Sequence, residues 1–190
     1  MPEKEEKNIL VGISGSISVI NMPSYLAFFK HTYGHVKVII TEQANKLFPA
    51  SSLSLFCDDI FQDHNETIDP NTASHVGLAR WADLFIVLPA TANKIGQVAN
   101  GLGMDLLSST ILASTKPVLF CPNMNEAMWN NFFVKRNIAL IKEGGHIIIP
   151  PVEKEAYEVA SGSIRKNFII PDMYTIAQEI DKAMAVEENS

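Results

Sequence analysis

The sequence lacks the features that mark several large classes of protein. It has no basic cluster, since 15 Lys and Arg residues stand against 21 Asp and Glu residues and the net charge is −6, so we expect no nucleic-acid partner. Its longest apolar stretch, near Leu84–Leu88, is far too short to span a bilayer. The N-terminus has no apolar segment typical of a secretory signal. We therefore expect no membrane insertion and a cytoplasmic location.

Cysteine is also scarce. The chain has 2 cysteines, Cys57 and Cys121, and they lie in separate apolar contexts without the spacing of metal ligands. We therefore predict reduced thiols rather than a disulfide, and no metal site.

Strand-like and helix-like segments alternate along the 190 residues. The strands are continuous apolar runs, which indicates burial on both faces and hence a parallel sheet covered by helices. The predicted strands are 8–13, 36–40, 84–88, 117–121 and 146–149. The predicted helices are 17–30, 41–47, 51–56, 75–81, 93–100, 104–113, 134–143 and 171–186, with 62–74 as a surface loop.

The predicted fold class is therefore α/β: a three-layer, doubly wound parallel sheet of the Rossmann-like or flavodoxin-like kind. A chain of this length fits one domain, which we place over 8–186, between a flexible arm at 1–7 and a tail at 187–190. In such sheets, ligands bind beyond the carboxyl ends of the strands. The turns at 12–18, at Thr41, at 89–94 and at 122–129 should therefore share one rim.

The turn Gly12–Ser18 has the composition of a phosphate site. Gly15 permits close backbone approach, the following helix presents free N–H groups, and the serines add hydroxyl donors. The third glycine of the dinucleotide fingerprint is missing, and Thr41 stands where that motif needs an acidic residue after the second strand. A mononucleotide phosphate therefore fits better than NAD. A capped turn with serines is the alternative.

The stretch Pro122–Trp129 offers two amides, two methionines and an indole after a buried strand. Pro122 should end that strand, and Asn123 or Asn125 can cap the next helix. Amides read both edges of a heteroaromatic ring, while Met and Trp add polarizable surface. At 89–94, small side chains would let a flat ring approach the backbone. Simple capped turns remain an alternative for both segments.

His75 follows a helix-capping Ser74 at the start of a short predicted helix. It shares a helical stripe with Leu78 and Ala82, so we expect the imidazole to point inward. Such a ring is a candidate proton acceptor. A histidine packed in the core is the alternative.

Together, these turns resemble the homo-oligomeric flavin-containing cysteine decarboxylases. That family carries the motifs Pro-Ala-Ser-Ala-Asn-Thr and Pro-x-Met-Asn-x-x-Met-Trp. Residues 89–94 differ from the first motif at Thr91 and Lys94, and residues 122–129 match the second at every fixed position. The resemblance implies a flavin cofactor, FMN or FAD, and homotrimers, often assembled into dodecamers, with the flavin between subunits.

The resemblance also implies roles for individual residues. Asn125 would contact the substrate, and His75 would be the catalytic base. The implied flavin contacts are Gly15, Ser16, Ile17, Thr41, Thr91, Ala92, Asn93, Lys94, Asn123 and Met124.

The stretch 157–167 distinguishes two branches of the family. The decarboxylases of coenzyme A biosynthesis, which act on phosphopantothenoylcysteine, carry a catalytic cysteine in this Gly-rich region, and here there is none. Without that cysteine the product should remain an unsaturated thiol, as in the lantibiotic decarboxylases of the epidermin and mersacidin pathways. The resemblance thus implies oxidative decarboxylation of the C-terminal cysteine of a ribosomally made precursor peptide to an aminoenethiol.

Residues Ser161 and Gly162 would then belong to a loop that closes over the peptide, unless the segment is an ordinary flexible turn. Two other functions stay open. One is phosphopantothenoylcysteine decarboxylation. The other is a non-catalytic flavin-binding regulatory subunit, although such relatives usually carry long acidic tails and only Glu187 and Glu188 are acidic here.

Overall fold

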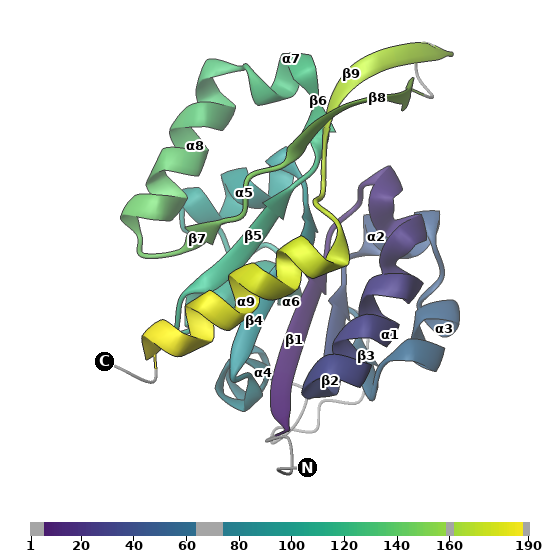
Figure 1. Ribbon diagram of the computed structural model, residues 1–190. Helices are drawn as coiled ribbons and strands as arrows, with labels where there is room; N and C mark the ends of the chain where they lie inside the picture. The colour runs from purple at the N-terminus through teal and green to yellow at the C-terminus, as the bar shows by residue number, and fades with distance from the viewer. Residues whose placement is uncertain (1–5, 64–73, 159–161, 188–190) are drawn as a thin grey trace.

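The computed structural model, which describes residues 6–63, 74–158 and 162–187, contains a parallel sheet in the strand order β3-β2-β1-β4-β5-β7 (Figure 1). This is the Rossmann order, in which the direction of winding reverses between β1 and β4. The predicted fold class is confirmed. The strands are β1 Lys7–Ile13, β2 Gly34–Ile40, β3 Asp59–Phe61, β4 Leu84–Ala90, β5 Val118–Pro122 and β7 Ile147–Ile148.

The sheet separates two apolar cores because alternate side chains of a strand point to opposite faces. On β1, Ile9 and Val11 pack with helices α1 and α9, whereas Leu10 packs with α4, α5 and α6. Both faces are covered, which explains the apolar runs in the central strands β1, β4 and β5. The helices are α1 Met22–Tyr33, α2 Glu42–Leu47, α3 Ala50–Leu53, α4 His75–Trp81, α5 Ala92–Ala99, α6 Leu106–Ala113, α7 Glu126–Trp129, α8 Phe132–Glu143 and α9 Met173–Glu187.

The segment predicted as one helix, 17–30, is divided. Ile17–Asn21 forms a 3-10 helix, and α1 starts at Met22 with Pro23 in its first turn, as expected. No helix among the described residues is long and apolar enough to cross a membrane. Residues 1–5 of the predicted arm and 188–190 of the predicted tail lie outside the described part of the chain.

Pro122 ends its strand, as predicted, but it is paired within the strand rather than lying just after it. Pro122 is the last residue of β5 and is paired with Ala90, which itself extends β4 past the predicted end of that strand. The missing N–H of proline does no harm, because Asn123 N donates to the Ala90 carbonyl at 3.0 Å. The register also shifts between Val87 and Ala90. The two strands therefore carry their turns further along the sheet than the sequence indicated.

A second, three-stranded sheet was not predicted. It has the order β6-β9-β8 and comprises Met124–Asn125, Ser163–Ile169 and Val152–Glu158. Strands β8 and β9 form an antiparallel hairpin that rises beyond the carboxyl edge of the main sheet (Figure 1). Much of the hairpin is exposed, so it carries no core-facing alternation that the sequence would reveal. The stretch predicted as a loop is thus largely two paired strands, and Ser161 lies outside the described residues.

Candidate functional site

The turns after β1 and β4 meet at the point where the winding of the sheet reverses. The hydroxyl of Ser14 donates to the Pro89 carbonyl at 2.8 Å and accepts the Thr91 N–H at 2.9 Å. Its oxygen also lies 3.3 Å from Thr91 Oγ1. Parallel strands whose connections leave in opposite directions open a crevice at their carboxyl ends. The rim predicted from the sequence is therefore present, and Ser14 joins two of its turns.

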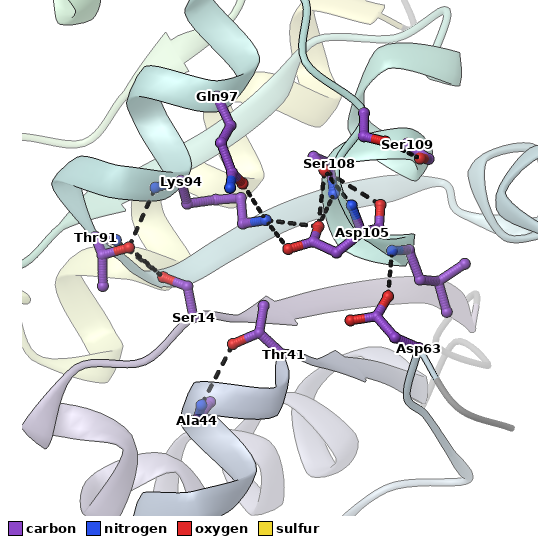
Figure 2. Close-up of polar contacts among 12 residues, drawn as sticks. Ser14, Thr41, Ala44, Asp63, Thr91, Lys94, Gln97, Asp105, Ser108 and Ser109 are labelled. Atoms are coloured by element: carbon purple, nitrogen blue, oxygen red, sulfur yellow. Dashed lines mark hydrogen bonds and ion pairs between the residues drawn. The ribbon is translucent and has the colours of Figure 1, made fainter.

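A cleft of about 720 Å³ opens at this rim (Figure 2). Its volume lies within the range of about 300–1,000 Å³ usual for small-molecule sites. It is lined by Ser14, Gly15, Thr41, Glu42, Gln43, Asp63, Thr91, Asn93, Lys94, Gln97, Met104 and Asp105. We refer to it below as the rim cleft.

The donors around the rim cleft fit an anionic phosphate. Thr91 caps α5 by accepting the Lys94 N–H at 3.2 Å, and Thr41 caps α2 by accepting the Ala44 N–H at 3.3 Å. Hydroxyl groups thus stand beside the first turn of α5, where unpaired backbone N–H groups attract negative charge. These hydroxyl and backbone donors and the size of the cleft suit the phosphate end of a flavin mononucleotide, although the lining also carries the carboxylates of Glu42, Asp63 and Asp105.

Gly15 is required for a different reason from the predicted one. A Cβ atom at this position would lie 2.7 Å from Gln43 Cβ and 3.3 Å from the Ala44 nitrogen. The missing side chain therefore lets α2 approach the first turn, and so brings Thr41 up to the cleft.

Lys94 is held inside the wall of the rim cleft. Its side chain is 2% exposed, and its Nζ atom contacts both carboxylate oxygens of Asp105, one at 2.6 Å, and Gln97 Oε1 at 2.7 Å. Burial lowers the pKa of Lys94, against the opposing pull of Asp105. Burial alone would raise the pKa of Asp105, but Lys94 and the donors of Ser108 outweigh it and hold that pKa below its usual range. The contact of Nζ with both carboxylate oxygens is the geometry of an ion pair.

Several residues predicted to contact flavin do not line this cleft. Ser16 donates its hydroxyl hydrogen to Asn123 Oδ1, and Asn123 Nδ2 reaches the Phe168 carbonyl at 3.5 Å. The Asn123 amide thus holds the first turn against β9. Ile17 lines a separate cleft of about 560 Å³ beneath the hairpin. Of the remaining two, Met124 is buried in the core and Ala92 opens α5.

The inward orientation predicted for His75 is wrong. Ser74 caps α4 as expected, accepting the Gly77 N–H at 3.0 Å, and His75 begins the helix. The core contacts of this helix come from Leu78 and Ala82, whereas His75, in the first turn, is exposed. In Figure 1, α4 lies toward the end of the sheet opposite the hairpin, and His75 does not line the rim cleft of its own chain.

Asn125 has the capping function predicted as one possibility. Its Oδ1 accepts the Met128 N–H at 2.9 Å and starts α7, while its backbone pairs with Asn167 in β9. Trp129, the last residue of α7, stacks on Phe168 with ring centroids 5.2 Å apart. The motif segment is thus fixed to the hairpin. Gly162 lies at the turn of that hairpin with a positive φ of 62°.

Sequence reasoning missed the far wall of the rim cleft, formed by Glu42, Gln43, Asp63, Gln97, Met104 and Asp105. For Asp105 there was a local signal, because it and Ser108 make a reciprocal capping box at the start of α6. Asp63, whose carboxylate accepts the Leu106 N–H, offered none, because it comes from a loop 43 residues away.

The model of the Flavoprotein family matches residues 2–179, and the chain belongs to this family. It is 43% identical to mersacidin decarboxylase from a Bacillus species, over 92% of this chain and 90% of that protein. It is 38% identical to the bifunctional coenzyme A biosynthesis protein CoaBC of Bacillus subtilis, over 77% of this chain but 36% of that protein.

Solved structures agree with this placement. MrsD from a Bacillus species superposes with a TM-score of 0.82 at 38% identity, covering 95% of this chain and 97% of that chain. EpiD from Staphylococcus aureus superposes with a TM-score of 0.82 at 34% identity, covering 90% of this chain and 99% of that chain. The cofactor of the family is a flavin, and one similar structure, SpaF, is described as an FMN-dependent cysteine decarboxylase.

Proposed function

We propose that this protein is a flavin-dependent decarboxylase that converts the C-terminal cysteine of a lantibiotic-like precursor peptide to an aminoenethiol. The observation that carries the proposal is the chemistry of the hairpin β8–β9, which contains no cysteine. Neither cysteine elsewhere can replace a reactive thiol. Cys121 is fully buried in β5, and burial raises the pKa of Cys57 to about 11.

The comparisons support the same branch. The chain matches mersacidin decarboxylase over nearly the full length of both proteins, and it is 29% identical to epidermin decarboxylase of Staphylococcus epidermidis over 88% of this chain. A structurally similar EpiD variant (TM-score 0.82, 28% identity) was solved in complex with the substrate peptide DSYTC. A peptide that ends in cysteine is the substrate we propose for this chain.

We propose that the rim cleft holds the flavin, with Ser14, Gly15, Thr41 and Thr91 around its phosphate. A flavin held there would supply the electron sink for the two-electron oxidation of the substrate cysteine that lets its carboxylate leave as CO2, with oxygen as the final electron acceptor. Asn123, held by Ser16, contributes by fixing the first turn against β9.

Two residues would act on the substrate itself. Asn125 Oδ1 already caps α7, so the amide hydrogens on its Nδ2 atom would bind the substrate carboxylate. His75 would assist deprotonation of the cysteine. Because His75 is exposed and does not line the cleft of its own chain, we propose that it serves the cleft of a neighbouring copy in a homotrimer or a dodecamer built from trimers.

The deciding experiment is to incubate the yellow protein with a synthetic peptide ending in cysteine and to record the mass of the product. Loss of CO2 together with two hydrogens is expected, and the same peptide ending in serine is the control. His75→Asn should retain the flavin absorbance but lose turnover, and normal activity of this variant would exclude the proposed role of His75.

The two other functions lead to different results. If phosphopantothenoylcysteine is consumed while the peptide is unchanged, the protein belongs to the coenzyme A branch. If neither compound changes although flavin is bound, the remaining function is that of a non-catalytic regulatory subunit.

A further inference from the structure

A buried pair of opposite charges forms part of the wall of the rim cleft. Lys94 is among the largest fully buried side chains of the described chain. Its Nζ atom lies 2.6 Å from Asp105 Oδ1 and 2.7 Å from Gln97 Oε1 (Figure 2). All three residues line the cleft. The cysteine decarboxylase motif has threonine at the position of Lys94, so this ammonium is a departure of this chain from the motif.

The pair also joins the starts of two helices. Lys94 lies in the first turn of α5, where its N–H is bound by the Thr91 hydroxyl. Asp105 caps α6, since its Oδ1 accepts the Ser108 N–H at 2.8 Å and the Ser108 hydroxyl at 2.7 Å. Breaking the pair would therefore loosen the spacing between α5 and α6, and with it the position of the Thr91 hydroxyl in the cleft.

We propose that the Lys94–Asp105 ion pair is a positioning device of the cofactor cleft that also sets the reduction potential of the flavin bound there. The inference rests on the assignment of the rim cleft to the flavin. Reduction adds negative charge to a flavin. In a wall of low dielectric, an ammonium group favours that charge and a carboxylate opposes it. While the two are paired their fields largely cancel, so removal of either partner leaves the field of the other.

This reasoning predicts shifts of opposite sign from two substitutions that break the same contact. Lys94→Met leaves the Asp105 carboxylate, still held by Ser108, and should lower the reduction potential. Asp105→Asn leaves the Lys94 ammonium and should raise it. Both should weaken flavin binding, because both loosen the link between α5 and α6. The double variant, which removes both charges, should return the potential toward the wild-type value.

The potentials are measured by equilibrium reduction of the flavin-loaded protein against a reference dye, and the affinities by quenching of FMN and FAD fluorescence on titration with apoprotein. Lys94→Arg keeps the charge and should keep the wild-type potential. If Lys94→Met does not fold, Lys94→Gln replaces it. Lys30→Met, which breaks the exposed Lys30–Asp58 pair outside the cleft, is the matched control and should change neither quantity.

Shifts in the same direction for Lys94→Met and Asp105→Asn, or unchanged potentials, would overturn the inference, because a purely structural contact has no reason to act with opposite signs. The assignment of the cleft is tested separately with Thr91→Ala. If that variant weakens flavin binding while the potentials of the charge variants stay fixed, only the ion-pair inference fails. If it leaves flavin binding intact, the flavin lies elsewhere and both proposals fall.

Discussion

Replacing Ser14 with alanine tests the junction on which the rim cleft depends. Ser14 is 2% exposed, and its hydroxyl makes two short contacts across the switch point, to the Pro89 carbonyl and from the Thr91 N–H. The substitution leaves the Thr91 N–H without its partner. An unsatisfied group costs about 1–3 kcal/mol of unfolding free energy when it is buried, and because the Thr91 N–H is part-buried we expect the lower end of that range.

For a chain of this size, each kcal/mol lowers Tm by about 2–4 °C. We therefore expect Ser14→Ala to melt several degrees below the wild type when both are measured without flavin. Flavin affinity should fall as well, because the Thr91 cap at the start of α5 is no longer fixed. Thermal unfolding followed by circular dichroism gives the first quantity, and fluorescence titration gives the second.

The matched control is Ser54→Ala. Its hydroxyl also donates to a backbone carbonyl, that of Ser51 at 2.9 Å, but this contact is exposed and water can replace it. We expect a change within about 0.5 kcal/mol, as for other surface substitutions. Equal melting temperatures for Ser14→Ala and Ser54→Ala would refute the claim that Ser14 joins the two turns.

Three further outcomes follow from the geometry. Gly15→Ala places a Cβ atom 2.7 Å from Gln43 Cβ, so α2 must shift at a cost of about 1–3 kcal/mol, and flavin retention after gel filtration should drop. Asn125→Asp keeps the cap on the Met128 N–H but loses the amide donor, so Tm should stay unchanged while peptide turnover falls. If Tm and turnover both fall, the result supports only the capping role of Asn125. Burial lowers the pKa of His146, whose Nδ1 accepts a backbone N–H at 3.1 Å. The unfolded chain therefore binds this proton more readily, and stability should be full above the unfolded pKa of about 6.5 and fall as the pH drops through it. Urea unfolding at several pH values measures that slope, and His146→Gln should flatten it.

The three-layer fold was predictable from the sequence because burial on both faces leaves a local trace. Strands β4 and β5, and β1 from Ile9 onward, are unbroken apolar runs, and the turns at their carboxyl ends carry the small and hydroxyl residues. Exposed, charged segments leave no such trace. This is why the sequence predicts a loop over 157–167, where β8 and β9 pair through their backbones.

The candidate site was predictable only in part. Gly15, Thr41, Thr91, Asn93 and Lys94 line the rim cleft as neighbours of the predicted turns. Other residues belong to a family motif but do not line the rim cleft, because the direction of a side chain depends on what packs against its helix or strand. Ser16 is turned toward Asn123. His75 is exposed because other residues of α4 face the apolar core.

By itself the sequence determined the alternation of strands and helices, the uncharged, serine-containing turn after β1 and the absence of cysteine from the C-terminal hairpin, because each is a property of consecutive residues. Only the tertiary structure decided which turns meet. Ser14 and Pro89 are 75 residues apart, and they touch because strand pairing places β4 beside β1. The partnership of Lys94 with Asp105 was decided in the same way, since a buried charge takes the counterion that the packing of two helices brings to it.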